Sequence, residues 1–173
     1  IYMSFSKDIM RAHVIRYLIM YKMGGVYLDL DYEVFEPFDF KEYSIVVPLC
    51  RSLFFGDPLN ELGISIFASV PGHKFWADII QNLKSNPPVS KEYLQVLEAT
   101  GPMFITKIYN KNSYNDFYTP ERVLYHPALS KKKKEMEKIR KNGISKGIHH
   151  THGYWKQRWT LAYLKYKINN LIN

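Results

Sequence analysis

The sequence predicts one α/β domain with a mixed sheet, spanning residues 1–173. Its 173 residues are 46% apolar and 23% charged, a composition typical of a globular domain that buries its own core. Apolar residues recur at helical spacing in some segments and alternate with polar residues in others. Glycine and proline residues stand between these segments, where turns are expected. These patterns indicate helices and strands interspersed along a single chain.

The first two elements are the most clearly patterned. Residues 6–23 are predicted to form a helix because their apolar side chains recur at helical spacing. Gly24-Gly25 follows, and a glycine just past the last turn closes a helix. Residues 26–32 alternate apolar and polar side chains, which predicts a strand. Strand side chains alternate between two faces, so Asp29 and Asp31 would project together from one of them.

The remaining elements follow from the same patterns. An apolar stripe between a Pro-Gly turn and an Asn-Pro-Pro break predicts a helix over residues 73–83. The lysine-rich run at residues 131–141 is interpreted as a solvated loop or helix face. Further strands are predicted at residues 44–49, 63–69 and 123–125, and further helices at residues 91–97, 102–109 and 155–172.

Charge is unevenly distributed, with a net −3 over residues 1–100 and +11 over residues 101–173. The basic part predicts an anionic partner, either a phosphate group, a nucleic acid or a membrane surface. The basic helix at residues 155–172 fits a peripheral membrane contact, or else packs on the domain with solvated lysines. No apolar run reaches the roughly 18 residues of a membrane helix, and the start lacks a signal-peptide layout, so we expect a cytoplasmic location. The single cysteine, Cys50, excludes an intramolecular disulfide framework.

The strongest chemical signal is Asp29-Leu30-Asp31. Two carboxylates on one side of a strand end form a hard-oxygen site for Mg²⁺ or Mn²⁺ that leaves positions open for phosphate oxygens. In open α/β sheets, ligands bind beyond the carboxyl ends of the strands, which is where these residues are expected. The alternative interpretation is a polar strand end without a ligand, since an Asp-x-Asp pattern is short.

The surrounding residues resemble the Asp-x-Asp glycosyltransferases of family 32. Its members include the fungal initiating α-1,6-mannosyltransferase and the animal α-1,4-galactosyltransferase, and clostridial glucosylating toxins share the core. The family pattern Asp-x-x-Arg, apolar helix, Gly-Gly-x-Tyr-x-Asp-x-Asp is matched by Asp8, Arg11, Gly24, Gly25, Tyr27, Asp29 and Asp31. Residues 100–106 resemble the family's Thr-Gly-Pro segment. Residues 149–155 resemble its terminal His-His-x-x-Gly-Ser-Trp, although Tyr154 replaces the serine. The family's first strand has no counterpart before Ile1.

The resemblance implies a GT-A-like (Rossmann-like) fold and retaining transfer of a hexose from a UDP- or GDP-sugar to a glycan or lipid-linked acceptor, with Mn²⁺ or Mg²⁺. Asp31 would ligate the metal. A histidine would complete the metal's coordination sphere, with His150 the preferred ligand and His152 the second choice. Asp29 would contact ribose or sugar hydroxyls and help to position the metal. The remaining donor-binding residues would be Asp8, Arg11, Gly25, Tyr27 and Trp155, with Arg11 holding the sugar or phosphate and Trp155 stacking on the base.

Purely structural roles are an alternative for several of these residues. Asp8 and Arg11, one helical turn apart, equally fit a surface ion pair. Trp155 also fits a core residue at a helix start. A double-displacement mechanism needs a carboxylate beneath the anomeric carbon, for which Asp57 and Glu61 are candidates. The strongest family signal lies elsewhere in the sequence, so front-face transfer is favoured.

Three rival functions are considered. A degenerate transferase would bind a nucleotide sugar or glycan without turnover. A nucleic-acid binder would explain the basic C-terminal part, yet it leaves the acidic strand unexplained, so we expect no nucleic-acid partner. A metal-dependent nuclease also uses paired carboxylates but fits the Gly-Gly-x-Tyr context poorly.

Overall fold

The computed structural model describes residues 2–38, 40, 42–51, 60–87, 93–127 and 133–150. The helices are α1 (Asp8–Met23), α2 (Lys74–Ser85), α3 (Tyr93–Thr100), α4 (Pro102–Lys111), α5 (Arg122–Tyr125) and α6 (Lys133–Lys141), with a 3₁₀ turn at Tyr2–Ser4 before α1. The strands are β1 (Gly25–Leu28), β2 (Tyr32–Val34), β3 (Ile45–Val46), β4 (Leu49–Arg51), β5 (Asn60–Leu62), β6 (Ile66–Ser69), β7 (Phe117–Tyr118) and β8 (Gly147–His149). The helix predicted at residues 155–172 lies outside the described residues.

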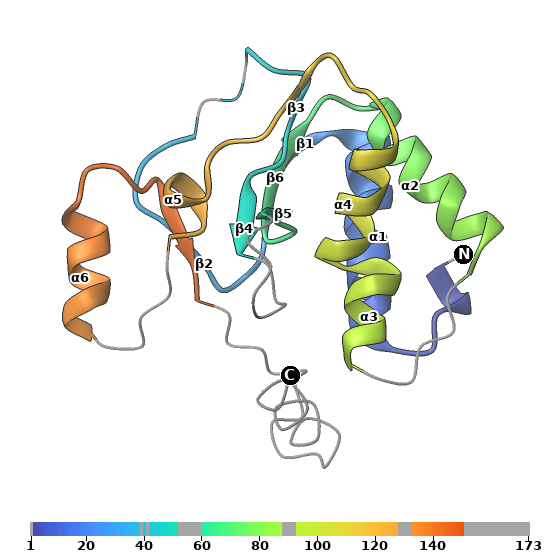
Figure 1. Ribbon diagram of the computed structural model, residues 1–173, viewed down its shortest axis with the longest axis horizontal. Coiled ribbons are helices and arrows are strands. Elements are labelled where there is room, and N and C mark those ends of the chain that lie inside the picture. The colour runs from blue at the N-terminus through green and yellow to red at the C-terminus, as the bar shows by residue number, and fades with distance from the viewer. Residues whose placement is uncertain are drawn as a thin grey trace.

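The central sheet has the strand order β1-β6-β3-β7. Strand β6 runs antiparallel to both of its neighbours, β1 and β3, whereas β3 and β7 are parallel. The predicted mixed sheet is therefore confirmed. Two antiparallel ribbons, β2 with β8 and β4 with β5, complete the described strands. Helices α1 to α4 gather on one side of the central sheet, while α5, α6 and β2 lie on the other side (Figure 1).

The core lies between α1, α2 and the sheet. Helix α1 buries one face completely, and α2 adds Phe75, Trp76 and Ile79, in agreement with the predicted apolar stripe. Gly24 then reverses the chain into β1 with a φ of +64°. A Cβ at this position would lie 2.6 Å from the carbonyl oxygen of Ser69, so only glycine allows α1 to pass this close to β6.

The Thr-Gly-Pro segment has a structural role in this fold. Thr100 is fully buried at the end of α3, and its hydroxyl lies 3.0 Å from Nδ1 of His13. The phenol of Tyr17 donates a 2.7 Å hydrogen bond to the Thr100 carbonyl. Pro102 opens α4 directly after this contact. The segment therefore fastens the α3–α4 corner to α1.

Two strand predictions need correction. The strand expected over residues 26–32 ends at Leu28, because the chain turns there and passes from the central sheet into β2. Residues 123–125 are helical rather than extended: the amide of Leu124 donates to Glu121 and that of His126 to Arg122, forming one helical turn. Three apolar residues are too few for their periodicity to distinguish a strand from a helix.

A third correction concerns sheet order. The strand predicted over residues 44–49 consists of two short strands, β3 and β4, which join different sheets. Strand β3 belongs to the central sheet, where β6 separates it from β1, and β4 pairs with β5. Within the described part of the chain, no helix is both long enough and apolar enough to cross a membrane.

Candidate metal and donor site

Asp29 and Asp31 lie in the turn that follows β1, and this turn, not a strand, brings their carboxylates to the same side of the chain. The amide of Tyr32 donates a 3.0 Å hydrogen bond to the Asp29 carbonyl, which closes the turn, and the side chain of Leu30 points fully into solvent. Asp29 stays tied to the central sheet, since its amide donates to the carbonyl of Ser65 at 2.8 Å. The two carboxylates therefore lie where the chain passes from the central sheet into the β2–β8 ribbon.

His149 completes a group of three at this point. It lies at the end of β8, directly opposite Tyr32 in the ribbon. Its Nε2 atom is 2.9 Å from Asp31 Oδ1 and 3.7 Å from Asp29 Oδ2. One ligand atom from each of the three residues lies within 4.8 Å of the other two. Two carboxylate oxygens and one imidazole nitrogen suit Mn²⁺ or Mg²⁺, so these residues fit a divalent cation.

Arg16 and Tyr27 hold Asp29 from the α1 side. The Arg16 side chain is 7% exposed, and its Nη1 lies 3.0 Å from Asp29 Oδ1. The same nitrogen donates to the Ile64 carbonyl at 2.6 Å, and the guanidinium lies 4.8 Å from the centre of the Tyr27 ring. The Tyr27 hydroxyl donates a 2.7 Å hydrogen bond to Asp29 Oδ1. Burial and the neighbouring Asp29 raise the pKa of Tyr27 above its ordinary value, so the phenol stays protonated and donates.

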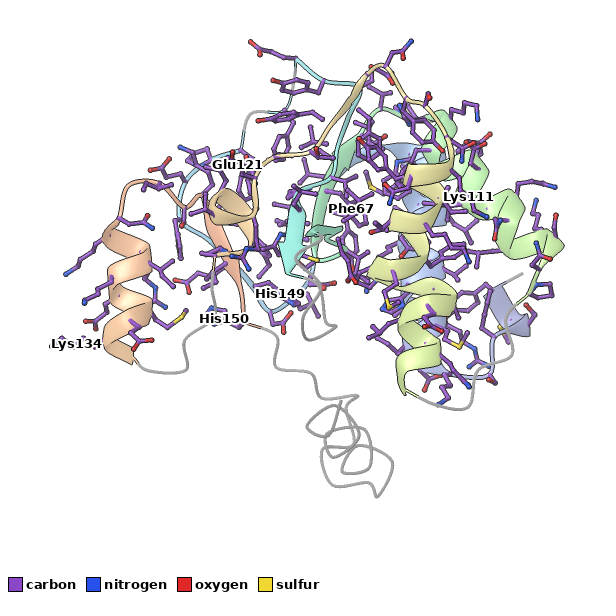
Figure 2. The ribbon with its side chains drawn as sticks, viewed as in Figure 1. Phe67, Lys111, Glu121, Lys134, His149 and His150 are labelled. Atoms are coloured by element: carbon purple, nitrogen blue, oxygen red, sulfur yellow. The ribbon has the colours of Figure 1, made fainter. Side chains whose placement is uncertain are left out.

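His150 lies in a separate cluster. Its Nε2 is 2.9 Å from Glu33 Oε2, because consecutive residues of an extended chain point to opposite sides. Arg140 of α6 donates two hydrogen bonds of 2.8 Å to the same carboxylate. The hydrogen bonds from Arg140 and His150 hold the pKa of Glu33 below its usual range. Figure 2 shows His149 and His150 next to each other at the end of the ribbon.

The structure brings some of the predicted residues together and not others. Asp29, Asp31 and Tyr27 form one cluster, whereas His150 faces Glu33 and Gly25 lies at the opposite end of β1. Asp8 is 97% exposed and pairs with Arg11 at 3.1 Å, as in the surface interpretation. Arg11 also donates to the Phe5 carbonyl at 2.8 Å.

Other predicted residues are placed away from the cluster or outside the description. Glu61 is buried on β5, opposite Cys50. His152, Trp155 and Asp57 lie outside the described residues.

The sequence motif offers His149 as well, but His150 and His152 are preferred to it as predicted ligands, and nothing in the motif points to Arg16. The signal for Arg16 was available, since a cation inside the apolar run Val14 to Leu18 is expected to need a buried anionic partner.

Comparisons with known proteins identify the family to which the sequence is similar. Residues 1–46 match the family described as "Glycosyltransferase sugar-binding region containing DXD motif". Over 133 residues the chain is 34% identical to inositol phosphoceramide mannosyltransferase 1 of Schizosaccharomyces pombe, covering 75% of this chain and 38% of that protein. Over 111 residues it is 31% identical to mannosyl phosphorylinositol ceramide synthase CSH1 of Saccharomyces cerevisiae, covering 62% and 27%. The chain thus spans about a third of the length of these curated relatives.

Proposed function

Because the chain belongs to the family of glycosyltransferases with a DXD-containing sugar-binding region, we propose that it is a metal-dependent, retaining hexosyltransferase with a GT-A-like fold. Its donor is a UDP- or GDP-sugar, and its acceptor is a glycolipid. The names of its relatives specify mannosyl transfer to inositol phosphoceramide, which favours mannose and an acceptor of that class. The observation that carries the proposal is the cluster of Asp29, Asp31 and His149.

The proposed metal ligands are Asp29, Asp31 and His149. His149 takes the role first predicted for His150, since its Nε2 faces both aspartates. A bound divalent cation would neutralise the charge that develops on the leaving diphosphate. Donor contacts by Asp8, Arg11 and Trp155 stay predictions.

The residues of the cluster favour front-face transfer. Asp31 faces His149, and Asp29 accepts one hydrogen bond from Tyr27 and pairs with Arg16, so neither is poised as a nucleophile. In front-face transfer the bond from the anomeric carbon to the phosphate oxygen breaks as the bond to the acceptor oxygen forms on the same face. The acceptor's proton passes to the leaving phosphate. Tyr27 and Arg16 would keep the side chain of Asp29 oriented throughout.

Donor binding can be tested by thermal unfolding with a panel of UDP- and GDP-sugars. A ligand at 100 times its Kd stabilises the native state by about 2.7 kcal/mol. For a chain of this size the midpoint should rise by roughly 5–10 °C. We expect this rise for one nucleotide class, and only with Mn²⁺ present. No shift with any donor would contradict the proposal, whereas a shift without sugar release or transfer would indicate the degenerate, binding-only alternative.

Helix α6 offers a surface for the glycolipid's membrane. Lys134, Lys138 and Lys141 follow each other at spacings of four and three, so they form one stripe, and all three are exposed. The opposite face is held to the body by buried Met136 and by the fork of Arg140 on Glu33. Lys134 lies at the end of α6, away from the central sheet (Figure 2). We propose that this lysine stripe contacts an anionic membrane near the acceptor.

Vesicle co-sedimentation tests this contact. Near an anionic surface each lysine contributes about 1 kcal/mol, so replacing all three by glutamine should weaken binding to phosphatidylserine vesicles about 100-fold. Replacing Lys84, Lys107 and Lys111, which are also exposed and lie on α2 and α4, removes the same charge and should have a smaller effect. Equal losses for the two triple variants would contradict a specific α6 contact, as would equal binding to neutral phosphatidylcholine.

A further inference from the structure

Two adjacent residues, Tyr125 and His126, are each connected to one side of the Asp29–Asp31–His149 cluster through one intermediate residue. Tyr125 ends α5, and His126 follows it. The two ends of the cluster come from distant parts of the chain, because Asp31 and His149 are 118 residues apart. Something must fix their relative position before a cation binds, or binding has to supply the cost of ordering them.

His126 acts on the aspartate side. Its Nδ1 lies 3.0 Å from the Leu49 carbonyl, which can only accept, so Nδ1 carries the ring proton. Nε2 is then an acceptor and receives the Ser65 hydroxyl at 2.7 Å. The carbonyl of Ser65 in turn accepts the amide of Asp29 at 2.8 Å. His126 therefore fixes the residue that holds the backbone of Asp29.

The imidazole of His126 has little freedom to move. Burial, with a contribution from nearby His149, lowers the pKa of His126 to about 4, so the ring is neutral near pH 7 and keeps this tautomer. A Cβ on Gly63 would clash with the Cε1 atom of His126, so the ring packs directly against the Gly63 backbone.

Tyr125 acts on the histidine side through Tyr32. The Tyr32 hydroxyl donates a 2.7 Å hydrogen bond to the Tyr125 carbonyl. The Tyr32 ring lies parallel to the His149 imidazole, with an interplanar angle of 15° and centroids 6.5 Å apart. The Tyr32 ring also meets His126 edge-on, with centroids 6.3 Å apart, and Phe38 edge-on at 6.4 Å. A Cβ on Gly147 would lie 2.6 Å from Tyr32 Cε1, so the ring lies flat against that strand. The orientation of Tyr32 thus limits that of His149.

We propose that the Tyr125-His126 dipeptide is the positioning element of the metal site, holding Asp29 through Ser65 and His149 through Tyr32. This inference rests on the proposed function of the cluster as a cation site. Residues that orient metal ligands typically change metal affinity about 10- to 100-fold when they are removed. The dipeptide itself touches neither the cation nor the substrate in this scheme, so its contribution is to preorganisation.

The test compares two phenylalanine variants of tyrosines with equally short hydrogen bonds. Y32F keeps the ring and removes the bond to Tyr125, while Y114F removes the 2.7 Å bond from Tyr114 to Asp78 on α2, away from the site. Mn²⁺ affinity is measured on the full chain by the electron paramagnetic resonance of free Mn²⁺. We expect Y32F to weaken binding about tenfold and Y114F to leave it within about twofold. S65A, on the other side of the cluster, should behave as Y32F does.

A second readout separates positioning from general destabilisation. The ¹⁵N chemical shifts of the His149 ring, recorded without metal, should change in Y32F and stay constant in Y114F. Equal Mn²⁺ affinities for Y32F, S65A and the wild type would overturn the positioning role, as would an equal loss in Y114F. Failure of the underlying metal site looks different, because the wild-type chain itself would then bind Mn²⁺ no better than D31A.

Discussion

Replacing Asp31 by alanine is expected to abolish the Mn²⁺-dependent stabilisation by nucleotide sugars and to lower transfer roughly 10³-fold. Asp31 provides the carboxylate oxygen nearest to His149 Nε2, at 2.9 Å, and without it the cluster retains only Asp29 and His149. Two ligands leave a divalent cation weakly held, and the diphosphate then loses the positive charge that its departure requires. Midpoint shifts and initial rates of sugar release, both measured with and without Mn²⁺, report the two losses separately.

The matched control removes a carboxylate from elsewhere on the surface. Glu98 is exposed on α3, and its replacement by glutamine alters the net charge as D31N does. E98Q should keep both the midpoint shift and the rate, whereas D31N should lose most of each, because an amide oxygen is a poorer ligand than a carboxylate. A metal-dependent shift of wild-type size in D31A would rule out Asp31 as a ligand.

The sequence allowed the grouping of the two aspartates at the candidate site to be predicted, through Gly24-Gly25 and the Asp-x-Asp pattern. The helix ends at the glycines as expected, and Asp29 and Asp31 do point to one side. The reason differs from the predicted one, since a turn and not a strand brings them together. Alternation of apolar and polar residues continues through residues 26–32, and nothing in that pattern indicates where one sheet gives way to another.

The choice of the histidine that faces the aspartates could not be predicted, because it depends on long-range strand pairing. His149 and His150 are neighbours in a motif that offers both, and the register of β8 against β2 decides which one faces Asp31. That register joins segments more than 100 residues apart and leaves no local pattern to recognise. The case of Arg16 differs, because its burial could be predicted from the apolar helix face around it. Its pairing with Asp29 could not be predicted.

Replacing Arg16 by alanine is expected to destabilise the chain by about 3 kcal/mol even without metal or donor. The change leaves Asp29 next to the Tyr27 ring without its cation, and it also frees the carbonyl of Ile64, which accepts from Arg16 at 2.6 Å. Breaking a buried ion pair costs more than the pair contributes, since the remaining charge stays poorly solvated. For this chain length the unfolding midpoint should fall by roughly 6–12 °C.

Arg140 provides the control that isolates burial. Its fork on Glu33 has two hydrogen bonds of 2.8 Å, better geometry than the single 3.0 Å contact of Arg16, but its side chain is 41% exposed against 7% for Arg16. Solvent screens the exposed pair, so R140A should lower the unfolding midpoint much less than R16A does. In the double variant R16A/D29N the loss should be smaller than the sum of the single losses, because removing Asp29's charge relieves the penalty that R16A creates. If R16A cost no more than R140A, or if the two losses added fully, Arg16 would be acting through its carbonyl contact with Ile64 alone, and Asp29 would owe its orientation to Tyr27.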